Sequence, residues 1–117
     1  MSFLFNIPDD PSIIPLPPEE VRIKVLSAEP YPDGKRLRVN LELTPFQKRP
    51  WIEATLVDAE GEEVSSANII EPLSWKIEFT LHIRRDPPQG SYTLAARLYY
   101  PEQAENDRRE VKIEIGD

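Results

Sequence analysis

One histidine is the residue of this 117-residue chain that could most readily act as a catalytic base. His82 lies in "SWKIEFTLHIRRD", and no nucleophile motif such as G-x-S-x-G accompanies it. A catalytic histidine needs both a nucleophile and a group that orients its ring. We therefore expect His82 to be a solvated surface residue and the chain not to be an enzyme.

The segment "DAEGEE", residues 58–63, has the most suggestive spacing of carboxylates. Calcium binds several oxygens at about 2.3–2.6 Å, and Asp58, Glu60 and Glu62 alternate along this segment. Because the spacing of a known calcium loop is missing, an exposed hairpin turn is the preferred interpretation and no metal site is predicted. The chain has no cysteine and only four scattered glycines, which excludes disulfides, thiolate sites and glycine-rich phosphate loops. No cofactor is expected.

A hydrophobic period of two runs from Glu20 to Ile115 and predicts β-strands that would position these side chains. In the first strand, Val21, Ile23 and Val25 are expected to face inward. No segment shows a helical period, and Asp33-Gly34 suits a tight hairpin. The expected strands are residues 21–26, 35–43, 51–58, 62–70 (weak), 74–83, 89–102 and 110–115. The fold class is therefore all-β, a two-sheet antiparallel β-sandwich of about seven strands.

The chain divides into a proline-rich N-terminal arm, residues 1–19, and a sandwich domain, residues 20–117. Five prolines in the arm exclude a helix and interrupt any strand ladder. A disordered leader is one interpretation. The other is that apolar residues such as Phe3, Phe5 and Ile7 dock on this molecule or on a neighbour.

The segment "GSYTLAARL", residues 90–98, resembles the sixth strand of immunoglobulin-like and fibronectin type III-like sandwiches. The resemblance covers about residues 19–117. It implies that Tyr92 is the tyrosine of the tyrosine corner, whose hydroxyl bonds the backbone a few residues upstream. Leu94 stands where antibody domains have the second cysteine, and the second-strand tryptophan of fibronectin type III domains is missing. Sandwiches of this type host adhesion, scaffolding and sugar-binding roles, so the fold alone does not specify a function.

The charge and hydropathy of the chain limit its partners. The net charge of -7 and the pI of about 4.8 oppose binding to nucleic acid. No apolar run approaches the roughly twenty residues that cross a bilayer, and no signal peptide is recognisable. We expect no membrane association and a cytoplasmic location, although a fragment of a secreted protein would have the same features.

Basic residues gather on one predicted sheet face. If the first, second and fifth strands share a sheet, its outer face carries more basic than acidic side chains. This face could contact an acidic partner or a neighbouring subunit, or it could be a solvated face of cross-strand pairs. The basic residues of this face are Arg22, Lys24, Arg36, Arg38, Lys76 and Arg84, and its acidic residues are Glu42 and Glu78.

A second candidate surface is apolar. In the fold that the resemblance implies, the third and sixth strands are neighbours, which would bring Trp51, Val57 and Tyr99 together on an outer face, with Tyr100 near the rim. The arm of the same chain, a second copy of the chain or a foreign ligand could cover this patch. The sequence thus favours a non-enzymatic protein-interaction or structural module, whose partner could be a second copy of the chain. The alternative is a carbohydrate-binding or adhesion-accessory domain that uses Trp51 and Tyr99 as a stacking platform.

Overall fold

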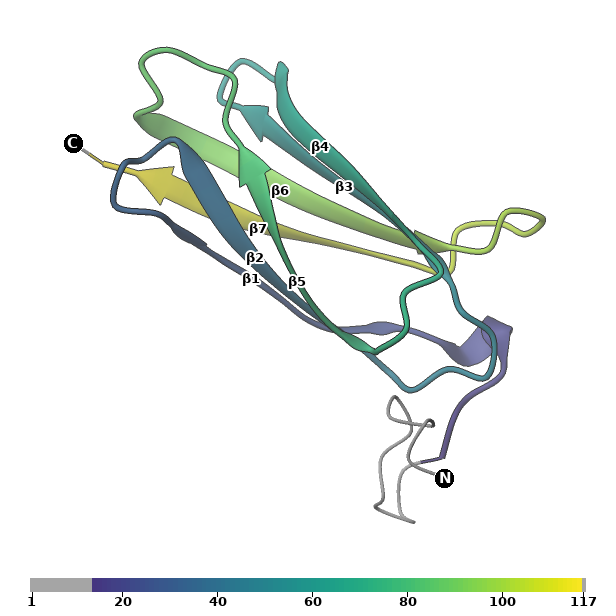
Figure 1. Ribbon diagram of the computed structural model, residues 1–117. Coiled ribbons are helices and arrows are strands. Elements are labelled where there is room, and N and C mark those ends of the chain that lie inside the picture. Colours follow the sequence, from purple (N-terminus) through teal and green to yellow (C-terminus); the bar gives the residue numbers. More distant parts are fainter. Residues whose placement is uncertain (1–13, 117) are drawn as a thin grey trace.

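Seven strands form two antiparallel sheets that pack face to face in the computed structural model, which describes residues 14–116 (Figure 1). The three-stranded sheet has the order β1-β2-β5, and the four-stranded sheet has the order β4-β3-β6-β7. The predicted β-sandwich is confirmed, and so is the weak fourth strand. The strands are β1 (Ile23–Pro30), β2 (Arg36–Leu43), β3 (Trp51–Asp58), β4 (Glu63–Ile70), β5 (Lys76–His82), β6 (Gly90–Tyr99) and β7 (Asp107–Ile115).

The described part of the arm contacts the sandwich at one end. The amide of Leu16 donates to the carbonyl of Pro45 at 3.0 Å, and Leu16 forms a parallel bridge with Phe46. A three-residue 3-10 helix, η1 (Pro18–Glu20), follows and leads into β1. Within residues 14–116 no helix has the length or hydropathy to cross a membrane.

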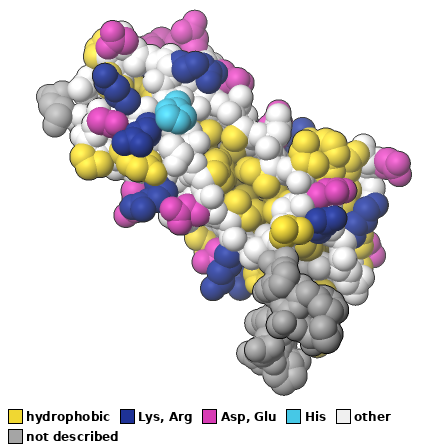
Figure 2. Space-filling view, in the orientation of Figure 1, with side chains coloured by type: hydrophobic (Ala, Val, Ile, Leu, Met, Phe, Trp, Pro, Cys, Tyr) yellow, Lys and Arg dark blue, Asp and Glu magenta, His cyan; other side chains and the backbone are white. Residues whose placement is uncertain are grey.

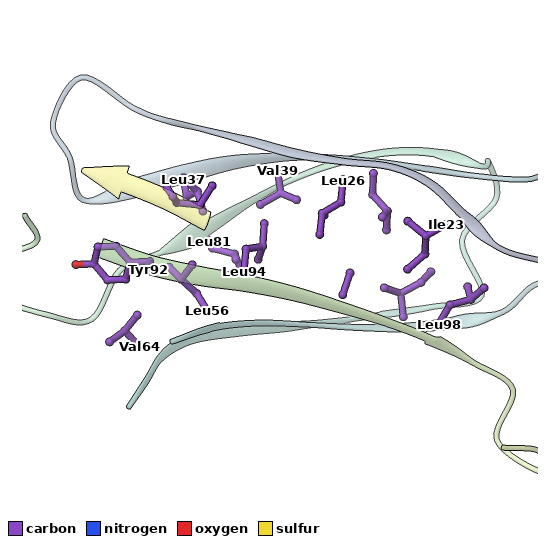
Figure 3. Packing of buried hydrophobic residues seen from close by; sticks show 14 of the residues in the cluster. Ile23, Leu26, Leu37, Val39, Leu56, Val64, Leu81, Tyr92, Leu94 and Leu98 are labelled. Carbon is purple, nitrogen blue, oxygen red and sulfur yellow. The ribbon is translucent and has the colours of Figure 1, made fainter. Parts of the chain in front are cut away.

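The core is a layer of interdigitated aliphatic side chains between the sheets (Figure 3). Leu37 and Val39 of β2 lie opposite Leu56 of β3 and Leu94 of β6, Leu98 of β6 lies opposite Ile23 of β1, and Leu37, Val39, Leu56, Leu94 and Leu98 are completely buried. Burying an aliphatic side chain stabilises a fold by about 1.5–3 kcal/mol. The alternation of buried and partly exposed residues is unbroken along β3 and β6, as the sequence predicts.

The first strand departs from the predicted pattern at a β-bulge. The pairing of β1 with β2 shifts register between Ile23 and Val25. A bulge inserts one residue and reverses which side chains face the core. Val25 is therefore 38% exposed and Leu26 is buried instead, so the prediction that Val25 faces inward is wrong.

Side chains from the start of β7 close the sandwich edge beside this bulge. The carboxylate of Asp107 accepts from the amide of Ile23 at 2.9 Å. The guanidinium of Arg109 donates to the carbonyls of Ile23 and Lys24 at 2.8 and 2.9 Å. These bonds satisfy backbone groups at the start of β1 that no strand reaches, so side chains of β7 close this end of the edge.

Tyr92 forms the corner contact that the resemblance implies. Its hydroxyl donates to the carbonyl of Pro88, four residues upstream, and its side chain is buried. The bond ties the loop before β6 to the core.

Replacing Tyr92 with Phe should lower the free energy of unfolding by about 1–3 kcal/mol, because the buried carbonyl of Pro88 loses its donor. Urea denaturation of the full chain measures the loss. Tyr31→Phe is the matched control, since the hydroxyl of Tyr31 makes only an exposed contact with Thr80, and it should change stability by less than about 0.5 kcal/mol. Equal losses in the two variants would contradict a structural role for the corner.

Candidate interaction surface

The outer face of the four-stranded sheet carries an apolar row at one end, here called the aromatic patch: Ile70, Trp51 and Tyr99. Trp51 pairs with Ile70 of β4 on one side and with Tyr99 of β6 on the other, so the three side chains share a face. The rings of Trp51 and Tyr99 lie 6.1 Å apart at 54°. Ile70 is 55% exposed. The patch is thus open to solvent at its β4 side.

Arg97 lies beside the patch in a fixed orientation. Its guanidinium stacks 4.1 Å above the ring of Tyr99. Its Nε donates to the carboxylate of Glu53 at 3.1 Å, and Glu105 lies 3.9 Å away. Ion pairs and stacking on several sides hold the planar group in place, so the patch and Arg97 form a preorganised surface.

Val57 lies on the same face but not in the aromatic patch. It is six residues beyond Trp51 on β3, a separation of about 20 Å, and it pairs with Thr93. Between them Thr55 and Ala95 help to line a shallow groove of about 150 Å³. The predicted single patch of Trp51, Val57 and Tyr99 is therefore wrong: strand alternation gives them a common face, but polar and small residues separate them.

Tyr100 is buried rather than at the rim of the surface. Only 1% of its side chain is exposed, and its hydroxyl donates to the carbonyl of Lys48 at 2.7 Å. Burial raises the pKa of Tyr100 to about 12. Tyr100 faces inward because successive side chains of a strand point to opposite faces and Tyr99 points outward.

A polar pocket of about 170 Å³ lies next to Trp51. Three loops build it: the one between β2 and β3, the one between β4 and β5, and the one between β6 and β7. Sequence reasoning missed this pocket because its members are far apart along the chain. It is lined by Lys48, Arg49, Trp51, Glu71, Tyr100, Pro101, Glu102 and Gln103.

The predicted basic face of the three-stranded sheet is neutralised by local pairs. Arg38 lies 3.6 Å from Glu29 and 3.9 Å from Glu78. Arg36 lies 3.2 Å from Asp33, a turn residue. The sequence did not predict an ion pair with Glu29. The bulge in β1 turns Glu29 onto the outer face, opposite Arg38. A strongly basic face is therefore not present in the centre of this sheet.

The other predicted basic residues are dispersed. Arg22 precedes β1 and donates to the carbonyls of Glu19 and Val21 at 3.0 and 2.8 Å. Arg84 follows β5 and lies exposed at the opposite end of the sheet. Lys24 and Lys76 line a groove with Ile14 and Trp75.

The residues considered for chemistry lie on β5 and around the turn between β3 and β4. His82 is exposed on β5. One carboxylate oxygen of Asp58 accepts from the amides of Glu60 and Glu62 at 2.9 Å, and the other lies 3.8 Å from Arg85. Among residues 14–116 no group of acidic or histidine side chains is arranged to hold a metal ion.

The prediction that the arm covers the aromatic patch lies outside the described residues. It concerns Phe3, Phe5 and Ile7, all of which precede Ile14.

Comparisons with known proteins find the fold but no family. No protein-family model matches the chain, and no curated protein matches it. A family 76 glycoside hydrolase from a bovine Bacteroides thetaiotaomicron strain is similar in structure, with a TM-score of 0.63 and 17% identity over 81% of this chain. A β-glucuronidase from Lactobacillus rhamnosus has a TM-score of 0.55 and 19% identity over 82% of this chain. The chain covers 20% and 16% of those two chains. At these identities the likeness establishes the β-sandwich fold.

The burial of Tyr100 predicts a specific loss of stability in alkali. Below about pH 10, the ordinary pKa of tyrosine, the phenol is neutral in both folded and unfolded chains and its contribution is complete. Between that pH and about 12, where Tyr100 ionises in the fold, only the unfolded chain loses the proton, so the free energy of unfolding falls as pH rises.

Unfolding measured from pH 9 to 11.5 should show a steeper decline for the natural chain than for Tyr100→Phe. Tyr99→Phe serves as the matched control and should follow the natural chain. Parallel declines in all three proteins would show that Tyr100 is not the group responsible.

Proposed function

We propose that this domain is a non-catalytic interaction module that binds a partner protein, or a second copy of itself, through the aromatic patch. The observation that carries the proposal is the row of Ile70, Trp51 and Tyr99 on the sheet face that points away from the core. Exposed apolar groups that include aromatic residues mark protein interfaces, and tryptophan, tyrosine and arginine are their most frequent energetic centres.

The geometry of Arg97 supports the same function. A guanidinium already stacked on Tyr99 and paired with Glu53 loses little further freedom when a partner covers it. The edges of the patch are polar, with the pair Arg49 and Glu71 on one side at 3.9 Å. An apolar centre with a polar rim is the usual composition of a protein interface.

Longer chains contain this fold as one part of their length, which is consistent with a role as a module. The matched glycoside hydrolases are much longer chains in which this fold accounts for about a fifth or less of the length. A sandwich whose interior is filled by core side chains acts on its surroundings through its faces and loops.

Carbohydrate binding is the second candidate, and the pocket beside Trp51 favours it. Glu71, Glu102 and Gln103 line this pocket and offer hydrogen bonds to hydroxyl groups, and a sugar ring can stack on the adjacent indole. Glycoside hydrolases also contain this fold.

Photo-crosslinking tests the leading proposal directly. With Tyr99 replaced by p-benzoylphenylalanine, irradiation of the full chain in an extract of its own cells should give a discrete adduct. Mass spectrometry would identify the adduct as another protein or as a second copy. Trp51→Ala in the same chain should reduce the adduct several-fold, because truncating a central aromatic residue typically costs more than about 1 kcal/mol of binding.

Position 31 supplies the matched control, because Tyr31 is also aromatic and partly exposed but belongs to the turn after β1, beside the other sheet. The benzoyl side chain at position 31 should not give the same adduct. The same adduct from position 31, or an adduct from position 99 that survives Trp51→Ala, would argue against the aromatic patch.

Tryptophan fluorescence distinguishes the two candidates. The chain has two tryptophans, so Trp75→Phe leaves Trp51 as the only reporter. We expect its emission to stay constant when neutral and acidic oligosaccharides are added. A saturable change that Glu102→Ala abolishes would instead favour carbohydrate binding.

A further inference from the structure

One long edge of the sandwich is open. β5 and β4 are the terminal strands of their sheets on this side, and apolar side chains that face the core from them are only partly buried. Figure 2 shows apolar surface between β5 and β4 in the middle of the view. The partly buried residues are Ala67 and Ile69 of β4, and Trp75, Ile77 and Phe79 on or just before β5.

The free edge of β5 is protected only in part, by the exposed charges of Lys76 and Glu78. β5 contains no proline, and its inward positions are Ile77, Phe79 and Leu81, with no charge among them. Free edges of this kind can pair with another strand, and proteins usually block them. On the opposite side of the sandwich, Asp107 and Arg109 bond the backbone of β1 at Ile23 and Lys24. Within residues 14–116 no side chain of a neighbouring strand bonds the free edge of β5 in this way, so this edge can accept another strand.

The described end of the arm reaches the beginning of this edge. Ile14 lines a groove of about 570 Å³ together with Trp75, Lys76 and Lys24. Lys76 is the first residue of β5. Leu16 is held nearby by its bond to Pro45, so the preceding residues start from a fixed point beside β5.

We propose that residues 3–7 of the same chain bind along the free edge of β5 as an added antiparallel strand. The segment "FLFNI" places Phe3, Phe5 and Ile7 on one face, and it contains no proline before Pro8. These three side chains cover the apolar surface between β5 and β4. Since the arm is fixed near Lys76, a segment that lies back along β5 towards His82 runs antiparallel to it.

The length of the arm is sufficient. Ile7 precedes Ile14 by seven residues, which reach at most about 23 Å, and β5 with its seven residues is about 23 Å long. A link of this length can place Ile7 beside the first residues of β5 and leave residues 3–6 to run towards His82. A tether of this kind gives a local concentration of about millimolar, which favours the chain's own arm over that of another copy.

Charge is complementary along the same path. Asp9 and Asp10 lie between the proposed strand and Ile14. Lys24 and Lys76 line the groove that they would cross, with Glu42 between them. The two lysines outnumber the one carboxylate, so the groove suits an acidic segment.

A spin label at position 2 tests the proposal on the full chain. The chain has no cysteine, so Ser2→Cys carries a unique label. In a ¹⁵N-labelled sample we expect the amide signals at the His82 end of β5, and that of Val64 at the adjacent start of β4, to lose most of their intensity. Broadening centred on Trp51 and Tyr99 would overturn the proposal in favour of an arm that covers the aromatic patch, and no localised broadening would overturn it as well.

Mixing separates the chain's own arm from an exchanged one. Spin-labelled chain without ¹⁵N is combined with ¹⁵N-labelled chain that carries no cysteine. We expect the β5 signals of this mixture to keep their intensity. Broadening in the mixture would show that the arm binds a second copy and would overturn binding within one chain.

Two single substitutions complete the test. Phe5→Ser in the labelled chain should restore most of the lost intensity, because Phe5 is the central residue of the buried face. Leu4→Ser is the matched control on the opposite face and should leave the broadening unchanged. Equal effects of the two would contradict a strand with this orientation. The amide spectrum of each variant also reports whether the sandwich remains folded.

Discussion

The burial of every second side chain between two sheets is the constraint on which this molecule depends. Along β6 the inward residues Tyr92, Leu94, Ala96 and Leu98 are all at most 1% exposed. Close-packed interiors leave no room for a ligand. A ligand or partner could therefore contact this domain only at its outward faces, its loops and its edges.

The two sheets differ in strand number, and this gives the sandwich two unlike edges. On one side, β7 supplies side chains to the backbone of β1, where the bulge near Ile23 leaves groups without a strand partner. On the other side, β4 and β5 leave Phe79 and Ile69 partly exposed. A backbone edge must be paired, blocked or solvated, so the open side is where another segment of polypeptide has the most to contribute.

The charged residues act mainly by orienting one another. Arg97 is held between Glu53 and the ring of Tyr99, and Arg38 lies between Glu29 and Glu78. Exposed pairs of this kind contribute only about 0–1 kcal/mol to stability. Their effect on Arg97 is to keep a planar side chain ready for contact next to the aromatic patch.

The sequence by itself determined the seven strands and most of their inward faces, because alternation and turn chemistry act within about ten residues. The resemblance to immunoglobulin-like sandwiches added the corner at Tyr92 and the pairing of the strands that carry Trp51 and Tyr99. Tertiary structure alone decided the exposure of Val25, the hydrogen-bond partner of Tyr100 and the neutralisation of Arg38 by Glu29. Each depends on a distant partner: the hydroxyl of Tyr100 meets the carbonyl of Lys48, 52 residues away. The polar pocket beside Trp51 likewise needs three loops to meet at one end of the sandwich, and no local pattern encodes that meeting.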